Sequence, residues 1–381
     1  MKGMLQLYGR AFVRSAIESD VLVTLIGDKI VEAVQVAEAP AKARRVDGLI
    51  VPGFVDVHVH GGDDADFMDG AEAANRRILE FHARHGTTAL AATTLSGSRD
   101  DVHRAVKTIG AISSPTAKGC AEICAVHLEG PYISPARAGA QDRTSLRPAD
   151  ILEVTGLLAE APDLAWIVTL APEIEGARGL IEHFRDRIVF SIGHTAAGYG
   201  DTVAAIEWGA SHFAHLFNAM TPLSHREPGV VGAAMLAHDT TAELIADGAH
   251  VHPAVLRIAA VAMPNRIALI TDAMRACGRP DGVYRLYGHE AVVADGTARL
   301  ADGTLAGSVL TMSRAVKNMV ELAGLPLESV IPMASEVPAR IIGVAARKGR
   351  IAADYDSDLV VLSERLEVES VFVRGIELAS G

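Results

Sequence analysis

Residues 54–62 read FVDVHVHGG, a short apolar run that ends in two histidines one residue apart. Its Phe and Val residues favour a buried β-strand. Successive side chains of a strand point to opposite faces, so His58 and His60 share one face. The stretch therefore predicts a buried strand that presents two imidazoles at its carboxyl end.

Short apolar runs and helical patterns alternate through the middle of the chain. The further apolar runs lie at 88–94, 123–129, 166–172, 188–194, 212–218, 243–249 and 267–273. Helical patterns lie at 71–85, 99–112, 147–161, 175–187, 200–210 and 252–263. This alternation predicts an α/β fold of the (β/α)8 TIM-barrel type. The alternative, an open doubly wound sheet, usually carries G-x-G-x-x-G after its first strand, and none follows FVDVHV.

Both ends of the chain are rich in β-like runs. VLVTLI (21–26) and KIVEAVQV (29–36) flank a Gly-Asp turn, and ESVFVRGIEL lies near the carboxyl end. We therefore predict one small sheet domain built from residues 1–52 and 345–381, with the barrel domain at 53–344.

Composition narrows the classes of function. The net charge of −12 argues against non-specific binding to nucleic acid or to a membrane surface. The three cysteines include no C-x-x-C pair, which is typical of a reducing compartment. The first residues carry no apolar signal segment, and no apolar run reaches membrane-spanning length. We expect a cytoplasmic protein that acts on a small molecule.

Polar residues capable of binding a metal follow most of the predicted strands. In a TIM barrel the carboxyl ends of the strands build the active site. Histidine nitrogens with a carboxylate suit Zn²⁺, and Fe²⁺ or another divalent ion is an alternative. Each residue alone has an ordinary explanation, as a turn carboxylate or a packed core histidine, but their shared position favours a metal centre. The residues are His58, His60, Glu129, His194, His215, His250 and Asp272.

The remaining histidines have no predicted ligand role. His127 and His212 lie inside predicted strands, where packing or support of the ligands is expected. The others fall in predicted helices or surface loops; they are His82, His85, His103, His183, His238 and His289.

Six segments carry a resemblance to a known family. They are HLEGPYISP (127–135), SIGHTAAGY (191–199), HFAHLFNAMTPLSHREPGVVGAAM (212–235), IADGAHV (245–251), ITDAM (270–274) and LAGSVLTM (305–312). Together they resemble the N-acetylglucosamine-6-phosphate deacetylases of the amidohydrolase superfamily. The resemblance implies a barrel with a small β-sandwich from both termini. It also implies metal-dependent removal of the acetyl group from N-acetyl-D-glucosamine 6-phosphate, by a homodimer whose phosphate site lies near the subunit contact.

The resemblance also implies roles for individual residues. Glu129, His194 and His215 match the primary metal ligands, and Asp272 matches the catalytic carboxylate that accepts a proton from water and returns it to the amine. Substrate-contacting positions are matched by Ala140, Asn218, Ala219, Arg226, His250, Leu305, Ala306 and Gly307.

The chain departs from the family pattern in two places. Some members lack the histidine pair of the first strand and use one metal, so His58 and His60 leave open whether one or two ions bind. Many members have a histidine where this chain has Gln141, which as a neutral amide polarises a substrate carbonyl more weakly. Two alternatives remain at this point: another amide hydrolase of the superfamily, or a non-catalytic amidohydrolase-like scaffold.

Overall fold

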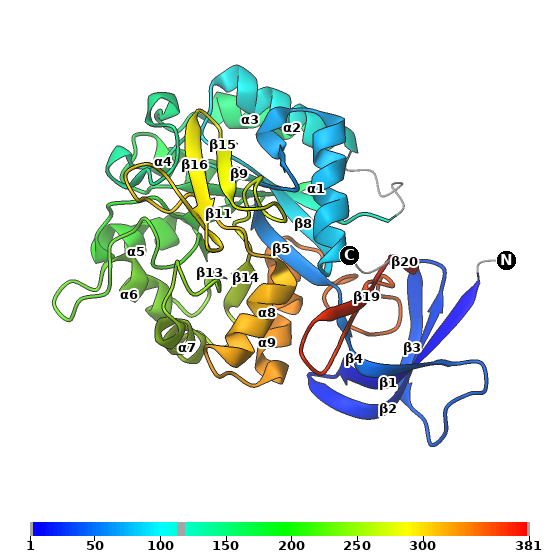
Figure 1. Cartoon of the computed structure of the whole chain (residues 1–381). Coiled ribbons are helices and arrows are strands. Elements are labelled where there is room, and N and C mark those ends of the chain that lie inside the picture. The colour runs from blue at the N-terminus through cyan, green and yellow to red at the C-terminus, as the bar shows by residue number, and fades with distance from the viewer. Residues whose placement is uncertain (1–2, 113–118, 379–381) are drawn as a thin grey trace.

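The computed structural model describes residues 3–112 and 119–378, and it confirms the predicted barrel. Eight strands form one parallel sheet in the order β14-β13-β12-β11-β10-β9-β8-β5. The first and last of these strands meet at the mouth, where the Asp272 amide donates to the His58 carbonyl at 2.9 Å. The barrel occupies the larger part of the molecule in Figure 1. The strands are β5 (Phe54–Val59), β8 (Thr87–Thr94), β9 (Glu122–Glu129), β10 (Ala165–Leu170), β11 (Val189–Ile192), β12 (His212–Phe213), β13 (Thr241–Ile245) and β14 (Ile267–Ile270).

Helices surround the barrel sheet, and the six predicted ones are all present. They are α1 (Glu72–Arg84), α2 (Arg99–Ile112), α3 (Ile151–Glu160), α4 (Ala177–Phe184), α5 (Tyr199–Trp208) and α7 (Pro253–Ala262). Four further α-helices and three short 3₁₀ helices were not predicted. These are α6 (Gly229–Leu236), α8 (Met312–Glu321), α9 (Leu327–Ala334), α10 (Glu336–Ile341), η1 (Phe67–Asp69), η2 (Pro135–Arg137) and η3 (Arg143–Ser145).

The two ends of the chain form one seven-stranded sheet beside the barrel (Figure 1). Its order is β20-β19-β18-β4-β1-β2-β3, and β4 pairs with β18, which joins the N-terminal and C-terminal segments. The strands of this sheet contribute to an apolar core of their own, which includes Leu7, Val23 and Phe372. The exact division at residues 52/53 and 344/345 stays a prediction, and the ends of that range, 1–2 and 379–381, lie outside the described residues. The strands are β1 (Met4–Val13), β2 (Ala16–Ile26), β3 (Lys29–Gln35), β4 (Arg44–Pro52), β18 (Leu359–Leu362), β19 (Val368–Val373) and β20 (Ile376–Leu378).

A three-stranded antiparallel sheet, absent from the predictions, follows β14 in the chain. It consists of β15 (Gly282–Leu286), β16 (His289–Ala294) and β17 (Thr297–Arg299), and a two-stranded ribbon, β6 (Gly61–Gly62) with β7 (Ala65–Asp66), follows β5. Leu286 of β15 lines the cavity at the barrel mouth, so this sheet covers part of the entrance. His289 lies in β16 and not in a loop or helix, which corrects its predicted setting.

No helix within residues 3–112 and 119–378 is both long enough and apolar enough to cross a bilayer.

A buried ionic cluster joins the barrel to the terminal sheet. The Lys348 Nζ, in a side chain only 1% exposed, lies 2.5 Å from Asp358, 2.9 Å from Glu122 and 3.1 Å from Asp356. Glu122 begins barrel strand β9, whereas the two aspartates precede β18 of the terminal sheet. A buried cation among carboxylates therefore links the two parts of the fold.

Replacing Lys348 by Met should destabilise the protein by about 3–5 kcal/mol, because it removes the buried cation that pairs with Asp358, whereas Glu122 and Asp356 keep Arg347. Chemical denaturation measures this change. The control is Arg14→Met: Arg14 pairs with Glu18 at 2.5 Å but is 60% exposed, so its loss should cost at most about 1 kcal/mol. Equal, small effects of the two substitutions would show that the cluster does not stabilise the fold.

Candidate metal centre at the barrel mouth

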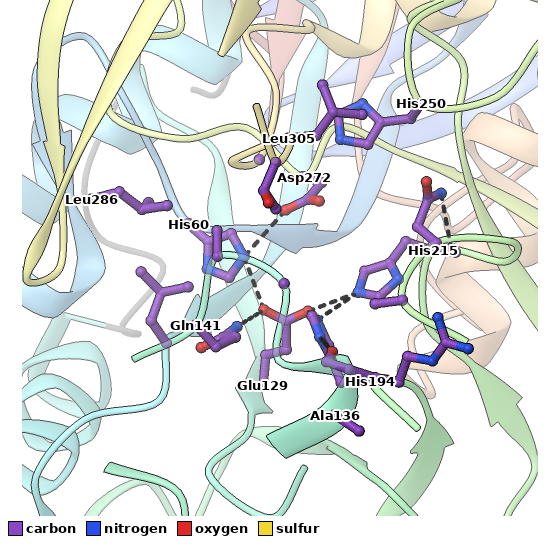
Figure 2. Close-up of a pocket in the computed structure, with 18 residues that line it drawn as sticks. His60, Glu129, Ala136, Gln141, His194, His215, His250, Asp272, Leu286 and Leu305 are labelled. Atoms are coloured by element: carbon purple, nitrogen blue, oxygen red, sulfur yellow. Dashed lines mark hydrogen bonds and ion pairs between the residues drawn. The ribbon is translucent and has the colours of Figure 1, made fainter. Parts of the chain in front are cut away.

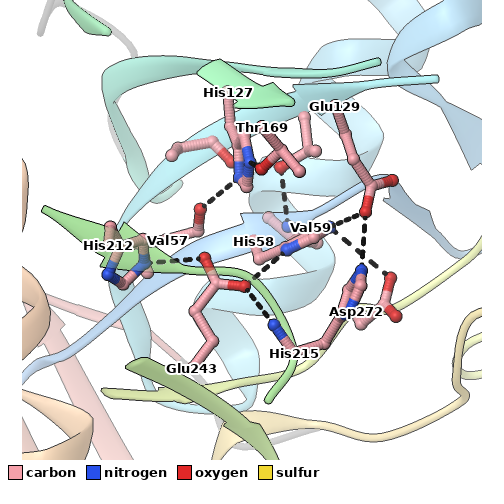
Figure 3. Close-up of polar contacts among 12 residues, drawn as sticks. Val57, His58, Val59, His127, Glu129, Thr169, His212, His215, Glu243 and Asp272 are labelled. Atoms are coloured by element: carbon pink, nitrogen blue, oxygen red, sulfur yellow. Dashed lines mark hydrogen bonds and ion pairs between the residues drawn. The ribbon is translucent and has the colours of Figure 1, made fainter. Parts of the chain in front are cut away.

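Glu129, the last residue of β9, lies among four imidazoles (Figures 2 and 3). Its Oε1 is 3.0 Å from Nε2 of His215, 3.2 Å from Nε2 of His194 and 3.3 Å from Nε2 of His58. Its Oε2 is 3.3 Å from Nε2 of His60. The carboxylate is only 2% exposed. The structure thus brings together all five predicted ligands that come from β5, β9, β11 and β12 or the residues directly after them.

The hydrogen bonds of His194 indicate which of its ring nitrogens can bind a cation. Its Nδ1 lies 2.9 Å from the Arg137 carbonyl, which only accepts, so Nδ1 carries a proton. In the neutral ring Nε2 is then an acceptor, yet it faces the Glu129 Oε1 and lies 3.1 Å from Nε2 of His215. Acceptors that face one another in a buried space are satisfied by a cation between them. One carboxylate with two imidazoles, leaving a position open, is the donor set of a catalytic Zn²⁺ site. The residues present therefore fit a divalent metal.

Beside this first group lies a second one made by His58, His60 and Asp272. The Asp272 Oδ1 is 3.2 Å from Nε2 of His60 and 3.8 Å from Nε2 of His58. Burial alone would lower the pKa of His60, but its hydrogen bonds to Asp272 and Glu129 raise that pKa to about 9. Burial likewise opposes ionisation of Asp272, yet the bond to His60 holds its pKa below the ordinary value. The carboxylates of Asp272 and Glu129 thus favour a positive charge beside them, either as a proton on His60 or as a second ion.

Strained backbone conformations direct three of the site's side chains into the barrel mouth. His194, His215 and Asp272 have φ values of 47°, 28° and 48°, in the left-handed region that non-glycine residues rarely adopt. Each lies two residues beyond the end of its strand. Backbone strain of this kind is typical of functional sites, where the surrounding structure maintains it.

A cavity of about 330 Å³ opens over both groups (Figure 2). This volume suits a small ligand. Most of the predicted substrate-contacting residues line it; they are Ala140, Gln141, Asn218, Ala219, His250, Leu305 and Gly307. Ala306 is buried next to the lining, and His58 lies below it. Arg226 is exposed in the segment before α6 and is not among the residues that line the cavity.

Comparison with known proteins agrees with this geometry. A model of the amidohydrolase family matches residues 49–377. This chain belongs to the amidohydrolase family. It is 40% identical over 344 residues to N-acetylglucosamine-6-phosphate deacetylase of Bacillus subtilis, covering 89% of this chain and 85% of that relative. It is 38% identical to N-acetylgalactosamine-6-phosphate deacetylase of Escherichia coli O157:H7, over 93% and 94% of the two chains.

A solved amidohydrolase has nearly the same fold. N-acetyl-D-glucosamine-6-phosphate deacetylase of Mycobacterium smegmatis, in a mutant complex with N-acetyl-D-glucosamine-6-phosphate, superposes with a TM-score of 0.92 at 34% identity. The match covers 99% of each chain. It therefore includes the terminal sheet as well as the barrel.

Gln141, which stands where many family members have a histidine, bonds to the Glu129 carboxylate of this amidohydrolase. Its Nε2 donates to Glu129 Oε2 at 2.5 Å, and its Oε1 accepts from the Ser96 amide at 2.7 Å. These contacts fix which end of the amide faces Glu129. His250 is likewise oriented, because its Nδ1 lies 2.6 Å from the Asp247 carboxylate.

Sequence reasoning missed several residues of the site. Arg137, the last residue of η2, lines the cavity close to Ala140 in the chain, but a lone arginine carries no signal of its own in the sequence. Glu243 begins a predicted strand and was not singled out, because it lies before the strand's carboxyl end. Leu95, Leu286 and Thr304 line the cavity from segments with no distinctive pattern.

Two predictions for other histidines hold. His127 bonds to the Val57 carbonyl at 3.0 Å and to the Thr169 hydroxyl at 2.7 Å, a packing role. His212 bonds to Glu243 at 3.0 Å, and Glu243 in turn contacts the candidate ligand His58 at 2.8 Å. His82 is fully buried, with burial lowering its pKa to about 4, and it bonds to the Gly61 carbonyl at 2.9 Å.

Replacing Glu129 by Gln should abolish tight ion binding, because the Glu129 carboxylate lies 3.0–3.3 Å from Nε2 of all four imidazoles. We expect the affinity for Zn²⁺ to fall by more than the roughly 10- to 100-fold loss typical of an outer partner. Equilibrium dialysis with elemental analysis measures it. The control is Glu227→Gln, an exposed carboxylate before α6, which should bind as the wild type does. Unchanged affinity in Glu129→Gln would contradict the assigned centre.

Proposed function

We propose that this chain removes the acetyl group from N-acetyl-D-glucosamine 6-phosphate, giving D-glucosamine 6-phosphate and acetate. The observation that carries the proposal is the Glu129–imidazole cluster beneath a cavity of about 330 Å³. Relatives of 40% and 34% identity that carry the name of this activity support the choice of reaction.

Asp272 is the proposed proton carrier. Its carboxylate lines the cavity and lies 3.2 Å from His60 Nε2, which holds it ionised and therefore able to accept a proton from water. The same group can return the proton to the amine nitrogen, which leaves only when protonated. A bound divalent ion, for which we propose Zn²⁺, supplies Lewis-acid polarisation of water and of the acetyl carbonyl. Glu129, His194 and His215 would hold it.

Residues that line the cavity would bind the sugar phosphate. Asn218, Ala219 and His250 line it, and Leu305 and Gly307 face them from another segment. Arg137 also lines the cavity, and its guanidinium makes no hydrogen bond or ion pair with the described residues. In a chain of net charge −12, a cation at this position suits an anionic substrate.

Arg226 requires a different explanation. It lies outside the cavity lining of a single chain, so a contact with the substrate would require a second subunit or movement of its segment. We propose a homodimer in which this segment approaches the phosphate of the neighbouring subunit. We also propose a cytoplasmic location, because sugar phosphates are charged and do not cross bilayers unaided.

A second substrate remains a candidate. The relative named N-acetylgalactosamine-6-phosphate deacetylase is 38% identical over 93% of this chain. The two sugars differ only in the configuration of one hydroxyl, so the same centre could act on either. The scaffold alternative has less support, because every predicted metal ligand is present and converges on Glu129.

Purified, Zn²⁺-loaded protein should release acetate from N-acetyl-D-glucosamine 6-phosphate, and a chelator should stop the release. Asp272→Asn should lower kcat by about 100-fold or more, because it removes the acid–base group. Running N-acetyl-D-galactosamine 6-phosphate in parallel decides the preferred substrate. Absence of acetate from the N-acetylglucosamine compound would rule out the proposal, whatever the second sugar shows.

Arg137→Ala should raise KM for the phosphorylated sugar by about 10-fold, the effect of losing roughly 1.4 kcal/mol of binding energy. The kcat should change little, since Arg137 makes no side-chain contact with the acid–base group. Arg226→Ala tests the second subunit in the same assay. A KM unchanged in Arg137→Ala would remove this residue from the substrate site, and a KM unchanged in Arg226→Ala would do so for that one.

A further inference from the structure

A second buried carboxylate, Glu243 on β13, lies beside the candidate metal centre and contacts His58 and His215 (Figure 3). It is fully buried. Its Oε2 is 2.8 Å from Nδ1 of His58 and 3.0 Å from the backbone N of His215. Its Oε1 is 3.0 Å from Nε2 of His212. Glu243 therefore contacts one residue from each of the two candidate ligand groups.

These contacts fix the tautomer of His58. An ionised carboxylate only accepts hydrogen bonds, so the nitrogens that face Glu243 carry protons. In a neutral His58 ring, Nδ1 is protonated and Nε2 keeps its lone pair. That Nε2 is buried, has no hydrogen-bond partner among the described residues and lies 3.3 Å from Glu129 Oε1. The ring is thus held with a free lone pair directed toward the centre.

His212 shows the same pattern on the other oxygen. Its Nε2 donates to Glu243, and its Nδ1 lies 2.7 Å from the Thr241 hydroxyl, which can donate to it. Both nitrogens are satisfied, so His212 needs no ion. It donates one hydrogen bond to Oε1 of Glu243 and leaves Oε2 for His58 and His215.

The contact between Glu243 and His215 is made by the backbone amide of His215. His215 has a φ of 28°, and its amide donates to the Glu243 side chain instead of to another backbone group. The next amide, of Leu216, donates to the Glu243 backbone carbonyl at 2.9 Å. Glu243 thus accepts hydrogen bonds from two successive amides, which hold the turn that directs the His215 ring toward Glu129.

Glu243 is not itself suited to hold an ion with His58 and His127, although the three lie close together. Both nitrogens of His127 are occupied by Val57 and Thr169. Both oxygens of Glu243 already accept from N–H groups. A cation at this place would face protons and not lone pairs.

We propose that Glu243 is a positioning residue that fixes the tautomer of His58 and the backbone of His215, so that both ligand groups depend on one buried carboxylate. The inference rests on the metal dependence in the proposed function, but not on the substrate. Carboxylates that orient histidine ligands in this way increase metal affinity.

Glu243→Leu tests this in the full-length protein. Leucine carries no acceptor, so the His58 ring and the His215 amide, which both bond to Oε2, lose their partner together. We expect Zn²⁺ affinity, measured by equilibrium dialysis without substrate, to fall by about 10- to 100-fold. The matched control is Glu153→Leu, which removes a carboxylate that is 7% exposed and pairs with Arg147 away from the candidate ligands, and it should leave the affinity near that of the wild type. Circular dichroism and thermal unfolding report whether each variant is folded.

Wild-type affinity in folded Glu243→Leu would overturn the proposal, as would an equal loss in Glu153→Leu. Should Glu243→Leu not fold, ¹⁵N-histidine NMR of wild-type protein loaded with ¹¹³Cd²⁺ decides the question. The proposal expects the metal coupling on Nε2 of His58 and the proton on Nδ1, and the reverse assignment overturns it. Since every readout is ion binding, a failure to release acetate would count against the proposed function alone.

Discussion

The molecule depends on a carboxylate that is only 2% exposed and lies among four imidazoles beneath the cavity. Glu129 faces Nε2 atoms of His58, His60, His194 and His215 at 3.0–3.3 Å, so the region concentrates lone pairs that need positive charge. A protein pays a large desolvation penalty for such a cluster unless protons or a cation satisfy it. An ion does so while leaving a coordination position for a reactant, and this links the energetics of the site to its chemistry.

The barrel makes that cluster possible because a closed parallel sheet brings the ends of distant segments to one rim. The candidate ligands come from residues 58 to 272, yet each lies at or just beyond the end of its strand. Left-handed backbone conformations at His194, His215 and Asp272 then turn the side chains inward. Gln141 from above and Glu243 from below hold the central groups by hydrogen bonds, so rings and carboxylates are oriented before an ion or substrate arrives.

Much of this could be predicted from sequence, and the reasons for the remainder are physical. The barrel strands were found because each is a short apolar run between helical patterns. The candidate ligands were singled out because His58, Glu129, His215 and Asp272 occupy corresponding places at the ends of those runs. Helix α6 was missed because GVVGAAML is apolar on every side and has no helical periodicity. The small sheet β15–β17 was missed because its strands are short and half exposed. Glu243 supports the ligands from the middle of the barrel, where a carboxylate's function depends on contacts that spacing along the chain does not show.

Anomalous X-ray diffraction at the zinc absorption edge, on crystals of Zn²⁺-loaded protein, tests the central claim most directly. The account predicts an anomalous peak within coordination distance of Glu129, His194 and His215, at about 2.0–2.2 Å from the donor atoms. A peak elsewhere in the molecule, or no peak in protein that releases acetate, would show that the cluster around Glu129 is not the centre of the reaction.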